Sequence, residues 1–96
     1  MVTGSDQQGD NKVTVRVLFF ASLREAVGSA EVSLDLTAPI SLEGLMEKLE
    51  TRIPSSGFAA LTGESVRVAV NQTLSSGPIL IHPGDEVAFL PPVTGG

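Results

Sequence analysis

The end of the chain carries its most distinctive chemical group. Gly95 and Gly96 have no side chains, so the functional group there is the α-carboxylate of Gly96. Because glycine has no Cβ, this end can enter a channel too narrow for other residues, and its acyl carbon is open to attack from either face. The sequence predicts acyl chemistry at Gly96, with Gly95 giving access. The alternative is a terminus without function, as most chain ends are.

Two prolines precede this end. Pro91 and Pro92 fix φ near −65° and favour an extended backbone, which directs the last residues away from the body. From Pro92 to Gly96 the reach is roughly 13 Å at about 3.3 Å per residue. We therefore expect residues 91–96 to form a flexible tail that reaches into a partner's pocket while the folded part stays outside.

Other residue types point to little further chemistry. Cysteine is absent, which excludes a thiol nucleophile and a thiolate metal site. His82 is the only histidine, and without a second ligand at useful spacing we interpret it as a loop residue rather than a metal ligand. No paired carboxylates, Ser–His arrangement or phosphate-binding loop stands out. We expect no metal and no cofactor on this chain.

The charge balance bears on the choice of partner. Lys and Arg number 6 against 11 Asp and Glu, for a net charge of −5. This balance disfavours nucleic acid, whose phosphates would be repelled, and favours a protein partner with a basic docking face. With no signal-peptide core and no apolar run near the ~20 residues that span a bilayer, we expect a cytoplasmic protein without membrane contact.

Hydrophobic periodicity predicts the elements that must hold out the tail. At 96 residues without a repeat the chain should form one domain, preceded by a disordered extension at residues 1–12. Strict alternation predicts long strands at 13–20, 31–36, 65–70 and 86–90. Val13 is expected to be the first inward residue of the first strand. A minor strand is expected near 73–74, a brief apolar segment at 79–81, a helical turn at 21–27 ended by Gly28, and turns at 71–72 and 83–85.

One clear helix is expected between these strands. Its apolar residues recur as a single stripe from Leu42 to about Arg52, Ser41 is its N-cap and Pro54 ends it. Gly44 within it suggests close packing against the sheet. Residues 55–63 are expected to be a loop that could contain a helical turn.

This order of elements predicts an α+β fold. The first and last long strands should be central neighbours in a mixed sheet, with the helix packed across one face. That is the ubiquitin-like β-grasp arrangement, which we place at residues 13–90. In it the exit of the last strand projects the tail into solvent.

Three stretches resemble a known family. VLFFASLRE (Val17 to Glu25), VAVNQTL (Val68 to Leu74) and GDEVAFLPPVTGG (Gly84 to Gly96) closely resemble the small, sulfur-carrier subunits of molybdopterin synthase. The resemblance covers essentially all of residues 13–96. A Gly-Gly ending alone is shared by ubiquitin and by the thiamine-pathway sulfur carrier, so the specific part is the GDEVAF run leading into PPVTGG.

The resemblance implies the sulfur-donating subunit of a two-subunit sulfurtransferase, not an enzyme on its own. In this family an ATP-dependent E1-like activating enzyme adenylates the terminal glycine, and sulfur from a sulfur-donating enzyme replaces the adenylate to give a thiocarboxylate. The tail then inserts into the large subunit, which holds the catalytic groups, and the sulfur passes to cyclic pyranopterin monophosphate. Two small and two large subunits usually form a heterotetramer.

Docking is expected to use apolar residues that the sheet leaves uncovered. Phe20, Leu74 and Leu90 are the candidates, with Pro91 and Pro92 at the rim and Val93 and Thr94 entering with the tail. The opposing interpretation makes the first three ordinary core residues. For Arg24 and Glu25 a partner contact and a solvated helix-end pair both stay open.

Three other functions remain as alternatives. One is a sulfur carrier of another pathway, such as the thiamine type, which shares the chemistry but needs a different acceptor. Another is a ubiquitin-like modifier that forms isopeptide bonds through Gly96. The last is an interaction domain whose tail does nothing.

Overall fold

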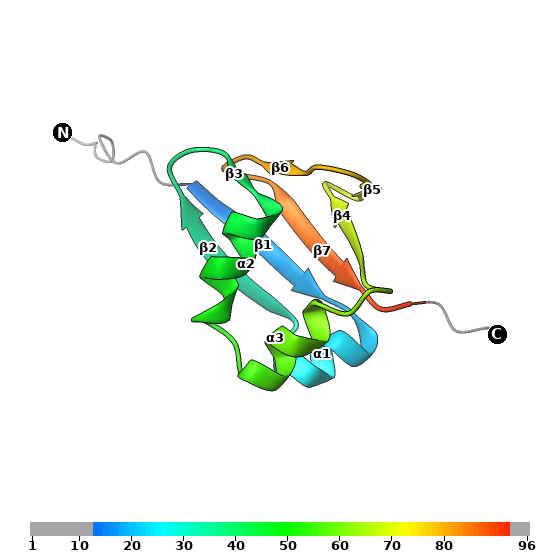
Figure 1. Ribbon diagram of the computed structural model, residues 1–96. Coiled ribbons are helices and arrows are strands. Elements are labelled where there is room, and N and C mark those ends of the chain that lie inside the picture. Colours follow the sequence, from blue (N-terminus) through cyan, green and yellow to red (C-terminus); the bar gives the residue numbers. More distant parts are fainter. Residues whose placement is uncertain (1–12, 93–96) are drawn as a thin grey trace.

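The computed structural model describes residues 13–92, in which short strands alternate with three helices (Figure 1). In chain order the elements are β1 (Val13–Phe19), α1 (Ala21–Val27), β2 (Glu31–Leu36), β3 (Ile40–Ser41), α2 (Leu42–Glu50), α3 (Ser55–Leu61), β4 (Arg67–Val70), β5 (Thr73–Leu74), β6 (Leu80–Ile81) and β7 (Glu86–Leu90). The five-stranded sheet has the order β2-β1-β7-β4-β5, and β3 pairs with β6 in a second, two-stranded sheet. This mixed sheet with helices on one face has the expected β-grasp arrangement.

The first and last long strands lie side by side within the sheet, as predicted. β1 and β7 run parallel, with Val17 opposite Val87 and Phe19 opposite Phe89. The two phenylalanine rings stack with their centroids 6.0 Å apart. All other pairs in this sheet are antiparallel. The end of β7 therefore delivers the chain to the edge of the molecule beside the end of β1.

The helices cover one face of this sheet (Figure 1), and the core lies between the two layers. Ser41 begins α2 as predicted, because its Oγ accepts a hydrogen bond from the Gly44 N–H at 3.1 Å. Burying a side chain of leucine or phenylalanine size contributes about 1.5–3 kcal/mol. The side chains that fill this layer are Val15, Val17, Phe19, Leu34, Leu36, Leu45, Leu49, Ile53, Val87 and Phe89.

The helix at residues 55–61 differs from the loop expected there. α3 packs against α1, and a Cβ built on Gly57 would lie 2.8 Å from the Val27 Cα and 2.9 Å from the Ala26 carbonyl oxygen. Only a residue without a side chain allows the two backbones to come this close. The short helix is thus set by packing, which sequence periodicity over seven residues does not reveal.

Three smaller predictions need correction. Val13 is 46% exposed rather than inward, because it is the first residue of β1 and lies beyond the β1–β7 pairing that begins at Arg16, at the margin of the core layer. Helix α2 ends at Glu50 rather than near Arg52. A Cβ on Gly44 would meet only Ile40 and Ser41, both at 3.5 Å, so this glycine does not mark close packing against the sheet.

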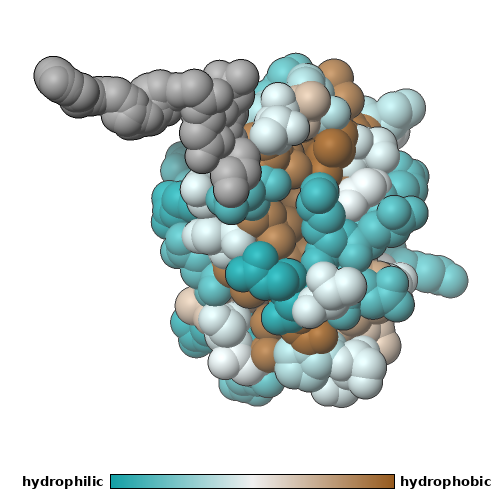
Figure 2. All heavy atoms as spheres, turned by 90° about the vertical axis from the view of Figure 1, so that its left-hand side faces the viewer, coloured by the Kyte–Doolittle hydropathy of each residue, from teal (hydrophilic) through white to brown (hydrophobic). Residues whose placement is uncertain are grey.

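Figure 2 views the molecule from the side where β2 and α2 lie, and shows a band of apolar surface bordered by hydrophilic residues. A hollow of about 270 Å³ on the described surface is lined by Leu34, Asp35, Lys48, Thr51 and Arg52.

Across residues 13–92, none of the helices combines the length and apolar character that crossing a membrane requires.

Candidate docking site beside the last strand

The sheet face opposite the helices carries a row of apolar side chains. Strand register aligns Leu18 of β1 with Ala88 of β7, Ala88 with Ala69 of β4, and Ala69 with Leu74 of β5. Because side chains alternate along a strand, all four point away from the helical layer. We call this row, together with Phe20 and Leu90, the outer patch.

The outer patch surrounds a hollow. The two alanines are too small to fill the space between the larger side chains, and a cavity of about 490 Å³ lies over them. Phe20 is 43% exposed and Leu74 is 58% exposed, whereas Leu90 is half-buried at the rim. An apolar side chain from another molecule could enter this hollow, so the patch has the form of a partner site.

A second hollow lies where the tail begins. It measures about 530 Å³ and shares Leu74 and Leu90 with the first hollow. The remaining residues around it are Glu64, Ser65, Arg67, Pro91 and Pro92. The structure therefore brings together five of the predicted site residues, Phe20, Leu74, Leu90, Pro91 and Pro92, along one side of the sheet. Val93, Thr94, Gly95 and Gly96 lie outside the described residues.

Phe20 is presented by a tight junction between β1 and α1. Its N–H donates to the Phe89 carbonyl at 3.2 Å, and its own carbonyl accepts from the Leu23 N–H at 3.0 Å. The next residue, Ala21, has φ of 51°, a left-handed conformation that costs an alanine about 1 kcal/mol. These bonds fix the backbone of Phe20 while its ring stays at the surface.

The β4–β5 hairpin that presents Leu74 is tied down by Asn71. Asn71 and Gln72 form its predicted turn with φ of 52° and 70°, and positive φ at both positions matches the twist of a two-residue hairpin. The Asn71 Oδ1 accepts from the Glu86 N–H at 3.0 Å, and its Nδ2 donates to Asp85 Oδ1 at 3.1 Å. Both bonds join the tip of the hairpin to the start of β7.

Asp85 is held as a carboxylate in this junction. Partial burial, the largest single influence, raises the pKa of Asp85. The backbone N–H of His82, 2.9 Å from Oδ2, the Asn71 amide and the nearby His82 ring act in the opposite direction and together hold the pKa of Asp85 below its ordinary value. Its charge therefore stabilises the turn at residues 83–85 that the sequence predicted.

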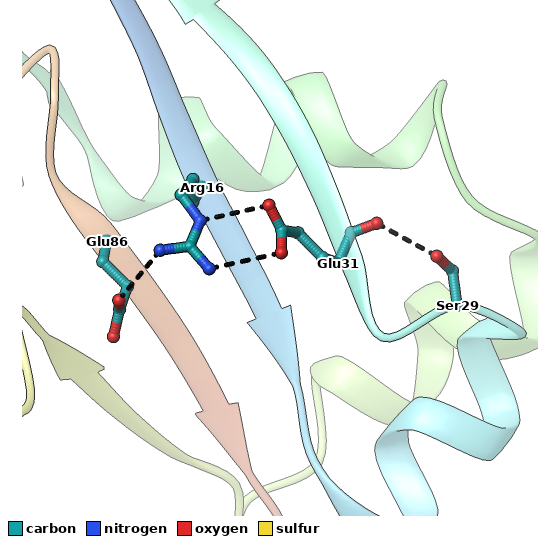
Figure 3. A network of polar contacts seen from close by, with 4 residues as sticks. All are labelled: Arg16, Ser29, Glu31 and Glu86. Carbon is teal, nitrogen blue, oxygen red and sulfur yellow. Dashed lines mark hydrogen bonds and ion pairs between the residues drawn. The ribbon is translucent and has the colours of Figure 1, made fainter.

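A charged group lies on the same sheet face, at the other end of the outer patch, where Arg16 of β1 is aligned with Glu86 of β7. Figure 3 shows this group. The Arg16 guanidinium donates to both carboxylate oxygens of Glu31, at 3.1 and 3.3 Å, and contacts Glu86 at 3.5 Å. The hydrogen bond and charge of Glu31 raise the pKa of Arg16, and the hydrogen bond from Arg16 lowers the pKa of Glu31. Because the three side chains come from β1, β2 and β7, they join neighbouring strands while exposed to water.

The other candidates lie away from the outer patch. Arg24 and Glu25 are exposed on α1, and His82 is exposed with its Nδ1 3.8 Å from Asp85. Among residues 13–92 no group of three histidine, aspartate or glutamate side chains could hold a metal ion.

Sequence reasoning missed four residues of this site: Leu18, Arg67, Ala69 and Ala88. Each occupies the outward position of its strand, which alternation does identify. What alternation within one strand cannot show is that these positions come into register across the three strands β1, β7 and β4. The sequence did carry one signal for a hollow, namely the small residues Ala69 and Ala88 at outward positions of two strands that prove to be adjacent.

Comparisons with known proteins agree with this fold. The chain is 40% identical over 82 residues to the molybdopterin synthase sulfur carrier subunit of Escherichia coli K12, covering 85% of this chain and 99% of that protein. The solved structure of a putative molybdopterin converting factor, subunit 1, from Pyrococcus furiosus is 30% identical, with a TM-score of 0.66 over 84% of this chain and 99% of that one. SAMP1 from Haloferax volcanii shares the fold, with a TM-score of 0.67 at 23% identity over 86% and 99% of the two chains.

The match to a protein family is equally extensive. The sequence model of the ThiS family aligns with residues 17–96, which include the outer patch, the hairpin of Asn71 and the residues after β7. The resemblance drawn from the sequence motifs is thereby confirmed, as is the ubiquitin-like β-grasp fold. The chain belongs to the ThiS family.

Proposed function

We propose that this protein is the sulfur carrier subunit of a molybdopterin synthase. The observation that carries the proposal is the position of Pro91 and Pro92, which leave β7 beside an uncovered apolar hollow in a chain 40% identical to a subunit of that name. A carrier needs both parts: a surface on which a partner docks and a reactive end near it. Positioning of this kind is the main contribution that a carrier makes to catalysis.

The chemistry is assigned to the end of the tail. An α-carboxylate is ionised at neutral pH and is a poor electrophile, so it needs activation. An ATP-dependent activating enzyme supplies this step: the Gly96 carboxylate attacks the α-phosphorus of ATP, and pyrophosphate leaves. Sulfur at the oxidation level of hydrosulfide, released by a sulfur-donating enzyme, then attacks the acyl carbon: the C–S bond forms, the bond to AMP breaks, and loss of the proton on sulfur leaves a thiocarboxylate. Since the chain has no cysteine, a side-chain thiol is not an alternative carrier position.

The large subunit would then receive the tail. The outer patch contacts it through Phe20, Leu74 and Leu90, while Val93 and Thr94 enter its active site together with the two glycines. There the thiocarboxylate sulfur adds to cyclic pyranopterin monophosphate, and water attack on the Gly96 acyl carbon breaks its bond to sulfur and restores the carboxylate. The acid, base and oxyanion groups come from the large subunit. Two copies of each subunit make the expected heterotetramer.

Intact-mass spectrometry tests the proposal. The full chain is incubated with an activating enzyme, ATP and a sulfur source, and the expected product carries one sulfur in place of one oxygen at its end. Addition of the large subunit and the pterin precursor should return the mass to its starting value as the dithiolene forms. Bonds to lysines of other proteins would instead indicate a modifier, and transfer only to a thiazole precursor would indicate the thiamine type. An unchanged mass would indicate that the protein is an interaction domain whose tail has no chemical role.

A further inference from the structure

The outer patch by itself does not determine how a partner sits on it. Apolar contact is non-directional, so the hollow over Ala69 and Ala88 could accept an anchor with the partner turned in several ways. Delivery of the tail, by contrast, needs one orientation. Charged groups at the rim of an interface commonly supply that choice.

At one end of the outer patch the cationic side chain already has its partners within the molecule. Arg16 is bound by Glu31 and contacts Glu86, so its donors are largely used within the molecule. Two carboxylates against one guanidinium leave this end with a net negative charge. It offers no cation to a partner.

Arg67 at the opposite end differs. It lies opposite Leu90 in the β4–β7 register, so its side chain points from the same sheet face, and it is exposed beside Pro91 and Pro92. Within residues 13–92 its guanidinium makes no hydrogen bond or ion pair, although Glu64 lines the same hollow. A guanidinium presents a planar set of donors that matches a carboxylate.

We propose that Arg67 fixes the orientation of the docked partner by pairing with a carboxylate that the partner presents beside the start of the tail. The proposal rests on the proposed function and adds to it the chemistry of the partner's surface: an apolar anchor for the outer patch with an aspartate or glutamate next to it. The chain's net charge of −5 favours a partner that is basic overall. The contact at Arg67, however, requires an acidic residue at one place on that basic surface. Requiring both features discriminates against partners whose surface is uniformly basic.

Titration calorimetry of the full chain against the large subunit tests this. Arg67→Glu is expected to weaken binding about tenfold at low salt, and Arg67→Gln about twofold, because reversal adds repulsion to the lost pair. Both effects should shrink at high salt. The matched control is Arg52→Glu, which makes the same charge change in the hollow between β2 and α2. It should change the affinity less than twofold, and all variants should keep the wild-type melting temperature.

A charge swap identifies the partner group. Each aspartate and glutamate of the large subunit near its docking face is changed to lysine, and one of them should restore binding to Arg67→Glu while weakening the wild type. Equal losses for Arg67→Glu and Arg52→Glu, or no rescue by any reversal, would overturn the inference. So would a wild-type dimer in sedimentation that Arg67→Glu dissociates, because Arg67 would then serve a contact between copies. If the wild type itself does not bind the large subunit, the proposed function fails with it; binding that ignores Arg67 counts against this inference alone.

Discussion

Leu90 joins the folded body to the tail and borders both hollows. Leu90→Ala should weaken the complex with the large subunit at least about tenfold, because it removes an apolar anchor that both hollows share. The melting temperature should change by less than about 3 °C, since the side chain lies outside the core layer. Calorimetric binding and thermal unfolding of the same preparation measure the two effects.

Leu80→Ala is the control for this substitution. Leu80 is also exposed, at 56%, but lies in β6 and lines neither hollow. Its loss should leave binding unchanged. A large thermal loss in Leu90→Ala together with normal binding would instead make Leu90 a core residue, as the opposing interpretation of the sequence holds.

Gly57 and Gly44 form a second comparison at this scale. Gly57→Ala should lower the free energy of unfolding by about 1–3 kcal/mol, since its methyl group would meet the backbone of Val27 and Ala26. Gly44→Ala has only ordinary contacts and should raise the free energy of unfolding by up to about 1 kcal/mol through helix propensity. Urea unfolding measures both. Equal effects of the same sign would mean that α1 and α3 are not held by close backbone contact.

At the scale of elements, the β4–β5 hairpin depends on a charge outside it. Because the pKa of Asp85 is lowered in the fold, its contribution is present above the unfolded value of about 3.9 and is lost as the pH falls through the folded value. Asp85→Asn should therefore cost about 1–2 kcal/mol of unfolding free energy at pH 7, from hydrogen bonds to a charged acceptor. The difference from wild type should begin to shrink near pH about 4 and should be lost only once the pH has fallen below the lowered pKa of Asp85 in the fold. Urea unfolding across this pH range measures it.

Glu47→Gln serves as the reference for this experiment, because Glu47 is exposed on α2, where the removal of a charge should have little effect. A cost of Asp85→Asn that stays constant from pH 7 into acid would show that the charge of Asp85 is not what holds the junction.

The strands illustrate what the sequence could and could not predict. Apolar residues recur at every second position of each long strand, so alternation identified all four of them and the inward side of β2 and β7. The segment of helix α3 was expected to be a loop that could contain a helical turn, because SSGFAAL is short and its helical state depends on contact with α1. The outer patch was found only in part, since Leu18, Ala69 and Ala88 become neighbours through pairing between strands distant in sequence. The end of the tail lies outside the described residues, so its role stays a prediction.

At the scale of the whole molecule, the body and the reactive end should be separable. Removal of Gly96 alone is expected to abolish sulfur transfer while leaving circular dichroism and the melting temperature unchanged, because the core layer ends with Phe89 in β7. Single-turnover dithiolene formation with the large subunit measures the loss. The truncated chain should still bind that subunit through the outer patch. Retained transfer would be incompatible with a carrier that acts through Gly96.

The parallel pairing of β1 with β7 also determines at what point of its synthesis the protein can fold. The sheet lacks a central strand until residues 86–90 have been synthesised, and contacts between such distant segments form late and slowly. A translation product that ends before Glu86 would lack β7, so β1 would have no partner strand between it and β4, and the hollow of the outer patch would lack Ala88. Such a fragment could not occupy the large subunit as an inert competitor, and proteases would be free to degrade it.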